Sequence, residues 1–251
     1  MASRESPPDI PELDLKFPDS PLALEAFAFS REHAPAFVHN HTVRTAYWAL
    51  IFAKKLPEFT KAAIDLEVLV VSAILHDMGW ARSKHLLSQD KRFEVDGANI
   101  ARDLIRRHAP DWDANRVQRA WDAIAFHTSS SLARYGAPEV ALVNLAVLAD
   151  FAGPNFKGAP VTLQEYRALT AVFPREGFTS EGLKGVLCGI CRDKPSTTYD
   201  NWVGSFGLEF GLDGNGGGKE EYAKAWREVQ AAAKLVPWLD ALSPPKRDKA
   251  E

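Results

Sequence analysis

The sequence predicts an all-α fold, a single helical bundle with flanking N- and C-terminal segments. Apolar residues recur at spacings of three and four along most of the chain, as in residues 39–56, and this is the pattern of an amphipathic helix. No stretch shows the sustained alternation of apolar and polar residues that is typical of strands. The chain also has no internal repeat and no linker that divides it, so one domain is the simplest interpretation.

Proline and glycine mark the ends of the predicted helices, for example Pro35, Pro57 and the pair Gly153-Pro154. The predicted helices cover residues 22–33, 39–56, 66–77, 94–108, 114–128, 139–151, 163–172, 180–191 and 220–235. Around them we expect an extended N-terminal arm over residues 1–20, the helical domain over residues 21–210, and a glycine-rich loop with a C-terminal helix packed on the domain over residues 211–251.

The composition is that of an ordinary globular protein, with 46% hydrophobic and 25% charged residues. A net charge of −3 gives no reason to expect nucleic acid or an anionic membrane as a partner. No apolar stretch approaches the roughly 20 residues of a membrane span, and the N-terminus lacks the apolar core of a secretory signal. Two cysteines argue against a disulfide scaffold. We therefore expect a cytoplasmic protein without a nucleic acid or membrane partner, with self-association into a homo-oligomer left open.

The stretch Ile74-Leu-His-Asp-Met-Gly79 carries the clearest chemical signal. The predicted helix before it is apolar on nearly every side, and such a helix is normally buried. Its end therefore carries His76 and Asp77 into the interior, where a carboxylate needs a cation or several donors. The partial negative charge at a helix C-terminus also favours a bound cation. Two interpretations follow, a metal site or a buried His–Asp hydrogen bond without an ion.

Further polar residues lie on the apolar faces of their predicted helices. The stripe through Ile124 leads to His127, and an otherwise apolar helix leads to Asp150. Glu94 begins a helix on its inward face, and His41 shares a face with Arg44. An aspartate or histidine in such a position is expensive unless it is paired or bound to a metal.

These positions offer a ligand set for one divalent ion, namely His41, His76, Asp77 and Asp150. Two imidazoles and two carboxylates favour Zn²⁺, with Fe²⁺ or Mn²⁺ as alternatives. They suit Mg²⁺ and Ca²⁺ less well, because these ions prefer shells made of oxygen alone. From the residues alone, hydrogen-bonded side chains without a metal stay a competing interpretation.

The ordered set resembles the HD-domain superfamily of metal-dependent hydrolases, in which an isolated histidine, an adjacent His-Asp pair and a distant aspartate bind the metal. A closer resemblance, over roughly residues 30–210, is to the cyanamide-hydratase-like branch. The segments that carry it are Asn40-His-Thr-Val-Arg-Thr45, Leu75-His-Asp-Met-Gly79, Arg92-Phe-Glu-Val-Asp-Gly-Ala98, Ala123-Ile-Ala-Phe-His-Thr128, Asp150-Phe-Ala-Gly-Pro154 and Lys194-Pro-Ser-Thr-Thr-Tyr-Asp-Asn-Trp202. The resemblance implies that residues 21–210 form an HD domain.

Two departures from other members of the superfamily narrow the expected chemistry. Many HD nucleotidases carry a glutamate three residues after the HD aspartate, where this chain has Trp80. Enzymes that act on cyclic dinucleotides carry further histidines for a second metal and a Gly-Tyr-Pro signature. That signature is absent here, and His127 is the one further histidine predicted to point inward. We therefore predict a mononuclear metal site.

The resemblance implies that metal-activated water adds to a small nitrile-like substrate, as in the hydration of cyanamide to urea. Glu94 is the first choice for a proton carrier and His127 the second, with Asp77 acting beside them as a ligand. Asn40 and Thr128 are predicted to hydrogen-bond the substrate, and Trp80 to line the pocket, although core packing would also explain that tryptophan. Arg44 is expected to hold a ligating carboxylate in place.

Three other functions stay open. The main alternative is an HD-domain phosphohydrolase that acts on a nucleotide or another phosphate ester. An oxygenase with a pair of irons would need His127 and Glu94 as ligands of a second ion. A structural metal site in a binding protein is the remaining alternative.

Overall fold

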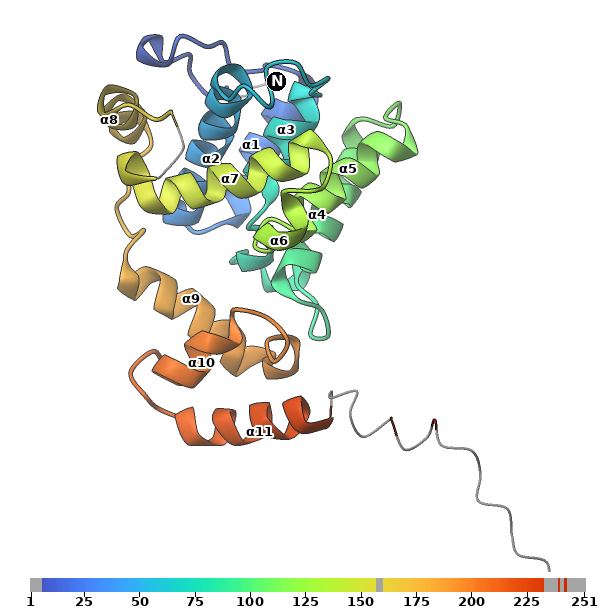
Figure 1. Ribbon diagram of the computed structural model, residues 1–251, viewed down its shortest axis with the longest axis vertical. Helices are drawn as coiled ribbons and strands as arrows, with labels where there is room; N and C mark the ends of the chain where they lie inside the picture. Colours follow the sequence, from blue (N-terminus) through green and yellow to red (C-terminus); the bar gives the residue numbers. More distant parts are fainter. Residues whose placement is uncertain (1–5, 157–159, 233–238, 240–241, 243–251) are drawn as a thin grey trace, which may run out of the picture. The chain divides into compact units, whose positions relative to one another are not determined.

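The computed structural model describes residues 6–156, 160–232, 239 and 242 (Figure 1). Among these residues it contains helices and no strand, so the predicted all-α fold is confirmed. The α-helices are α1 Pro21–His33, α2 Ala36–Lys55, α3 Leu66–Leu75, α4 Phe93–His108, α5 Ala114–Ala125, α6 Ser130–Ala133, α7 Pro138–Ala152, α8 Leu163–Val172, α9 Ser180–Asp193, α10 Gly204–Phe210 and α11 Lys219–Ala232. Short 3₁₀ helices are η1 Pro11–Leu13, η2 Met78–Trp80, η3 Lys84–Leu86, η4 Gly153–Asn155 and η5 Pro195–Thr197.

The chain divides into two compact units, Met1–Ser180 and Glu181–Glu251. The first unit contains helices α1 to α8, and the second contains α10, α11 and all but the first residue of α9. The predicted boundaries, which place the arm at 1–20, the domain at 21–210 and the C-terminal segment at 211–251, stay a prediction. Residues 1–5 of that arm, and residues 233–238, 240–241 and 243–251 of that segment, lie outside the described residues.

Helix α3 is the centre of the first unit, where it packs against α1, α2, α4, α5 and α7 (Figure 1). Every residue from Val68 to Leu75 is buried, as expected for a helix that is apolar on nearly every side. The end of α3 that carries His76 and Asp77 therefore lies inside the helical bundle, where their side chains are shielded from water.

A partly buried network of charges fixes the other end of α3. The Asp65 carboxylate caps this helix by accepting a hydrogen bond from the Val68 N–H at 3.1 Å, and Arg116 binds the same carboxylate. Glu139 of α7, which is fully buried, accepts from the Asp65 N–H at 2.8 Å and pairs with Arg119 of α5 at 2.8 Å. These contacts hold α3, α5 and α7 together.

Two predicted helices end earlier than expected, next to residues of the candidate site. Helix α3 ends at Leu75, so His76 forms its C-cap and Asp77 precedes η2. Helix α5 ends at Ala125, so His127 lies in the turn after the helix, where its N–H donates to the Ile124 carbonyl and its side chain is still buried.

A glycine allows α4 to pack directly on the turn after α3. A Cβ atom at Gly79 would lie 2.0 Å from the Phe93 carbonyl oxygen, far inside van der Waals contact. The first turn of α4 therefore lies against the His-Asp turn, which brings Glu94 toward the same region.

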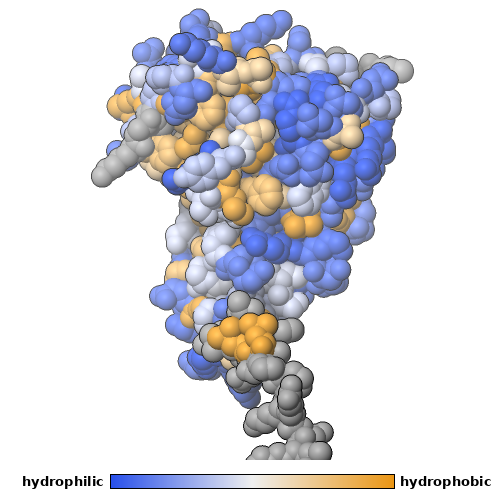
Figure 2. All heavy atoms as spheres, turned by 45° about the vertical axis from the view of Figure 1, so that its right-hand side comes forward, coloured by the Kyte–Doolittle hydropathy of each residue, from blue (hydrophilic) through white to orange (hydrophobic). Residues whose placement is uncertain are grey.

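In the part of the chain that the structure describes, no helix combines the length and the hydropathy needed to cross a membrane. Figure 2 shows a face on which hydrophilic and apolar side chains are mixed. Exposed large apolar residues such as Leu132 and Tyr135 are normal for a globular surface when they occur singly.

Candidate metal centre

His76 presents one ring nitrogen to the interior of the bundle. Its Nδ1 lies 2.7 Å from the carbonyl oxygen of Ala73, which can only accept, so Nδ1 carries the proton and donates it. The Nε2 atom of the neutral ring is therefore an acceptor with a free lone pair. Burial lowers the pKa of His76, and this outweighs the opposing effect of the Asp77 charge. A neutral imidazole is the form that binds a metal.

His41 on α2 has the same arrangement. Its Nδ1 lies 2.7 Å from Oδ2 of Asp150, and its Nε2 points toward His76. Burial acts to raise the pKa of Asp150, but hydrogen bonds from His41 and Arg44 and their charges hold it well below its usual range. Because this carboxylate is ionised and can only accept, Nδ1 of His41 is the donor. The lone pair of its Nε2 therefore also faces inward.

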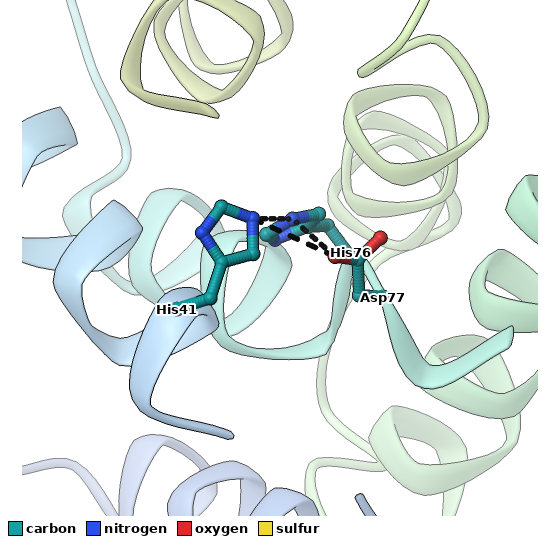
Figure 3. A group of neighbouring side chains, drawn as sticks. All are labelled: His41, His76 and Asp77. Carbon is teal, nitrogen blue, oxygen red and sulfur yellow. Dashed lines mark hydrogen bonds and ion pairs between the residues drawn. The ribbon is translucent and has the colours of Figure 1, made fainter. Parts of the chain in front are cut away.

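Three acceptor atoms converge at one point, as Figure 3 shows. The two Nε2 atoms of His41 and His76 are 3.3 Å apart, and Oδ2 of Asp77 lies 3.3 Å from His76 Nε2 and 3.6 Å from His41 Nε2. All three side chains are buried. Lone pairs this close repel one another unless a cation or a shared proton lies between them. An ion bound tetrahedrally at about 2.0–2.1 Å holds its ligands roughly 3.3 Å apart, so these residues fit a divalent metal.

His127 lies on the opposite side of the Asp77 carboxylate. Its Nδ1 donates to the Ile124 carbonyl at 2.6 Å, and its Nε2 lies 3.4 Å from Oδ1 of Asp77. Burial acts to lower the pKa of His127, but the contact with Asp77 and the charges of Asp77 and Glu94 outweigh it and raise this pKa. In the same way, the effect of the neighbouring histidines exceeds that of burial and lowers the pKa of Asp77. One oxygen of Asp77 thus faces the convergence point, and the other oxygen faces His127.

Asp150 lies beyond His41, outside the group of converging atoms. Its two oxygens accept hydrogen bonds from Arg44 Nε at 2.8 Å, Arg44 Nη2 at 2.7 Å and Trp48 Nε1 at 3.1 Å, in addition to the bond from His41. The structure therefore brings together three of the four predicted ligands. It places the fourth, Asp150, against the far nitrogen of His41, where a carboxylate orients a metal-binding imidazole. Arg44 binds the Asp150 carboxylate, which was predicted to be a metal ligand.

Residues 38–151 match the family model described as HD domain. The match covers less than half of the 251 residues. The match contains His41, the pair His76-Asp77 and Asp150, which are the residues that the sequence analysis selected. HD domains bind divalent metals and are typical of metal-dependent hydrolases, in agreement with the converging atoms found here. No curated protein matches the chain significantly. The resemblance to the cyanamide-hydratase-like branch stays a prediction.

Glu94 lies beside His127 in the HD domain, with its carboxylate already engaged. Oε1 accepts hydrogen bonds from Thr128 Oγ1 at 2.8 Å and from Arg92 Nη2 at 3.0 Å. Glu94 is fully buried, whereas Thr128 is half-buried. The structure therefore brings together Glu94, Thr128 and His127, three residues that the sequence analysis assigned to catalysis or substrate binding.

The two other residues predicted to contact substrate differ in their surroundings. The Asn40 amide donates to the carbonyl of Pro174 at 3.1 Å. Trp80 is buried, and its ring packs on that of Phe93 at 5.3 Å between centroids. Among the described residues, its Nε1–H has no hydrogen-bond partner. A buried donor of this kind costs about 1–3 kcal/mol unless something else accepts from it.

Sequence reasoning missed two residues that contact the HD site from the segment after α8. The ring of Phe178 stacks on that of His41, and Arg175 donates through Nη1 to the backbone carbonyl of Asp150. Both lie beyond the end of the family match. The glycine at 177, directly before an aromatic residue, was the available signal of a tight turn, but nothing in the sequence indicated which helix that turn would contact.

Proposed function

We propose that the protein is a mononuclear metal-dependent HD-domain enzyme that adds water to a small nitrile-like substrate, converting cyanamide to urea. The ion would be held by His41 Nε2, His76 Nε2 and Asp77 Oδ2. The observation that carries this proposal is the convergence of three buried acceptor atoms within 3.6 Å of one another, with both histidines fixed in the tautomer that binds metal.

Zn²⁺ is the favoured ion, because two imidazole nitrogens and one carboxylate oxygen are the donor set of many catalytic zinc sites, and Fe²⁺ or Mn²⁺ would also accept it. Three protein ligands leave a position for water or substrate. Bound there, the ion would lower the pKa of a water molecule to roughly 7 and polarise the substrate. Asp150 supports this site by holding the proton on Nδ1 of His41.

His127 would hold the proton that the substrate nitrogen receives. Its raised pKa favours the charged ring, with one proton donated to the Ile124 carbonyl and the other on Nε2 beside Asp77. Hydration forms one C–O bond, converts the C≡N bond to C=N and transfers a proton to nitrogen. The resulting isourea then tautomerises to urea. Water loses its first proton to His127 as its oxygen bonds to carbon, which replaces the proton that the substrate nitrogen received. The second proton moves from oxygen to nitrogen when the isourea tautomerises, so the overall reaction consumes one water molecule and no other reactant.

Glu94 would support this proton transfer. Its charge favours the protonated state of His127, and its Oε1 fixes the hydroxyl of Thr128. With its proton donated to Glu94, the Thr128 oxygen is left as an acceptor for a substrate amine. Glu94 is also the second candidate for the proton carrier, through the same hydroxyl.

Trp80 and Asn40 would complete the substrate contacts. The unpaired Nε1–H of Trp80 suits a substrate acceptor such as a nitrile nitrogen or a carbonyl oxygen. The Asn40 amide donates to Pro174, so its oxygen stays available to accept from a substrate amine. Both groups suit a small substrate with donors and acceptors on neighbouring atoms, which is a description of cyanamide.

A second function, hydrolysis of a phosphate ester, is favoured by one observation. Arg175 is 26% exposed in its side chain and lies 3.8 Å from Oδ2 of Asp150, next to the metal-binding histidine His41. A guanidinium so near the centre could bind a phosphate group.

The test is a direct comparison of the two reactions with zinc-loaded protein. We expect urea to form from cyanamide, and no phosphate to be released from a panel of nucleoside monophosphates. Replacement of His127 by Asn should reduce urea formation by about 10²–10⁴-fold, the usual contribution of a general acid or base. His85→Gln, at an exposed histidine, is the matched control and should retain full activity. Phosphate release without urea formation would replace the hydratase proposal by the phosphohydrolase.

A further inference from the structure

The segment Phe173 to Phe178 is fastened to α2 beside the metal centre. Arg44 Nη1 donates to the carbonyls of Phe173 and Pro174 at 3.2 and 2.9 Å, and Asn40 donates to the same Pro174 carbonyl. Arg44 is fully buried and also binds Asp150. The segment and the metal-binding histidine of α2 therefore share one set of anchors.

A left-handed turn at Gly177 precedes Phe178. The φ angle of Gly177 is +78°, a conformation that side chains disfavour, and a Cβ there would lie 3.1 Å from Cβ of Phe37. The glycine therefore lets the chain pass close to α2 as it approaches His41.

The ring of Phe178 covers one face of His41. Their centroids are 4.6 Å apart and their planes are inclined by 19°, so the rings are stacked. Phe151 closes the neighbouring edge, with its centroid 5.5 Å from that of His41 and 5.0 Å from that of Phe178. Phe178 is only 7% exposed, which makes it part of the packed surroundings of the ligand.

The side chains of Arg44 and Arg175 both lie against the Phe178 ring. The guanidinium carbons of Arg44 and Arg175 lie 5.4 and 4.9 Å from its centroid, within the range of a cation–π attraction. Both arginines also contact Asp150. Arg44 donates to the carboxylate that accepts from His41, and Arg175 donates to the backbone carbonyl of the same residue. Phe178 is thus positioned by the same groups that position the imidazole.

The hydrogen bond to Asp150 cannot fix His41 alone. It holds the Nδ1 atom, but the ring can still tilt about that contact, and a tilt moves Nε2 away from Asp77 Oδ2. A flat ring stacked on the face of His41 opposes this tilt, whereas a branched or flexible apolar side chain does so less well.

We infer that Phe178 is a positioning residue of the metal centre, which holds the plane of the His41 imidazole so that Nε2 stays aimed at the ion. The inference rests on the proposed metal site at His41, His76 and Asp77. It extends the functional region beyond the HD-domain match, which ends at residue 151.

Titration of the metal-free protein with Co²⁺, followed by its d–d absorption, tests the inference without any enzymatic assay. Replacement of Phe178 by Leu should weaken Co²⁺ binding about 10-fold, the lower end of the range for partners of a metal-binding histidine, and should shift the absorption bands. Phe178→Tyr keeps the ring and should restore most of the affinity. Thermal unfolding of the same samples shows that each variant is folded.

Phe173→Leu is the matched control, because Phe173 is also 7% exposed, belongs to the same segment and contacts Tyr47. It should bind Co²⁺ like the unmodified protein. If Phe178→Leu does not fold, Phe178→Met, which fills the volume with a flexible side chain, takes its place. Equal affinity and equal spectra for the Leu or Met variant and the unmodified protein would overturn the inference. Failure of the unmodified protein to bind Co²⁺ would instead overturn the metal site itself.

Discussion

The Asp150 carboxylate offers the sharpest test of how the centre is supported. Its two oxygens together accept four hydrogen bonds, two at each oxygen, from His41, Arg44 and Trp48. Asp150→Asn keeps the shape but replaces one oxygen by an NH₂ group. In either orientation of the amide, that NH₂ faces two donors. The substitution therefore leaves Arg44 buried without a counter-charge and weakens the orientation of His41.

Two separate losses follow, and both can be estimated. Removing one partner of a buried ion pair costs about 3–5 kcal/mol. The free energy of unfolding of a typical protein is roughly 5–15 kcal/mol, so the variant should still fold. Losing the partner of a metal-binding histidine weakens metal affinity about 10–100-fold, or roughly 1.4–2.7 kcal/mol. We expect both effects in Asp150→Asn.

Urea unfolding of the metal-free protein measures the first loss, and competition with a chromophoric zinc chelator measures the second. Asp65→Asn is the control, because asparagine also caps a helix and Asp65 contacts arginine rather than the metal ligands. It should leave zinc affinity unchanged. Unchanged stability and affinity in Asp150→Asn would refute the reasoning. A loss far above 100-fold would instead make Asp150 a direct ligand, as the sequence analysis predicted.

Two further predictions concern the fold around the site. Gly79→Ala would place a Cβ 2.0 Å from the Phe93 carbonyl oxygen and should cost at least about 3 kcal/mol in urea unfolding, whereas Gly185→Ala, with no described heavy atom within 4 Å, should gain about 1 kcal/mol. Burial, together with the charge of Arg31, lowers the pKa of His39 to about 4. As the pH falls, His39 therefore becomes protonated in the unfolded chain before it does so in the folded protein. The metal-free protein should lose roughly 3 kcal/mol of stability between pH 6.5 and 4. Measurements of Tm across this range should show the loss in the unmodified protein and not in His39→Gln.

The sequence allowed much of the centre to be predicted because helix phase decides which side chains face inward. The apolar helix before His76 had to be buried, and its end had to carry the His-Asp pair into the bundle. The position of His41 on α2 followed from the same periodicity. Even where α5 ended early, His127 stayed inward, because the turn after the helix continues along its inner face.

Other features depend on contacts between distant segments, and periodicity does not reveal them. Asp150, which is 109 residues away from His41, decides which nitrogen of His41 faces the convergence point. The sequence could therefore assign both residues to the site, but it could not show that Asp150 binds the far nitrogen of His41. Phe178 and Arg175 follow α8 without a recognisable motif, and their approach to α2 depends on the turn at Gly177. Trp80, selected for its position three residues after Asp77, has a buried donor that only the structure reveals.

The metal content of the purified protein tests the central claim most directly. Protein supplied with zinc and then dialysed should contain one equivalent of divalent metal per chain by plasma mass spectrometry. His76→Ala removes one of the three converging atoms and should lose nearly all of it, while the exposed His85→Gln control should keep the full equivalent. Metal-free unmodified protein, or full occupancy in His76→Ala, would contradict the assignment of the centre to His41, His76 and Asp77.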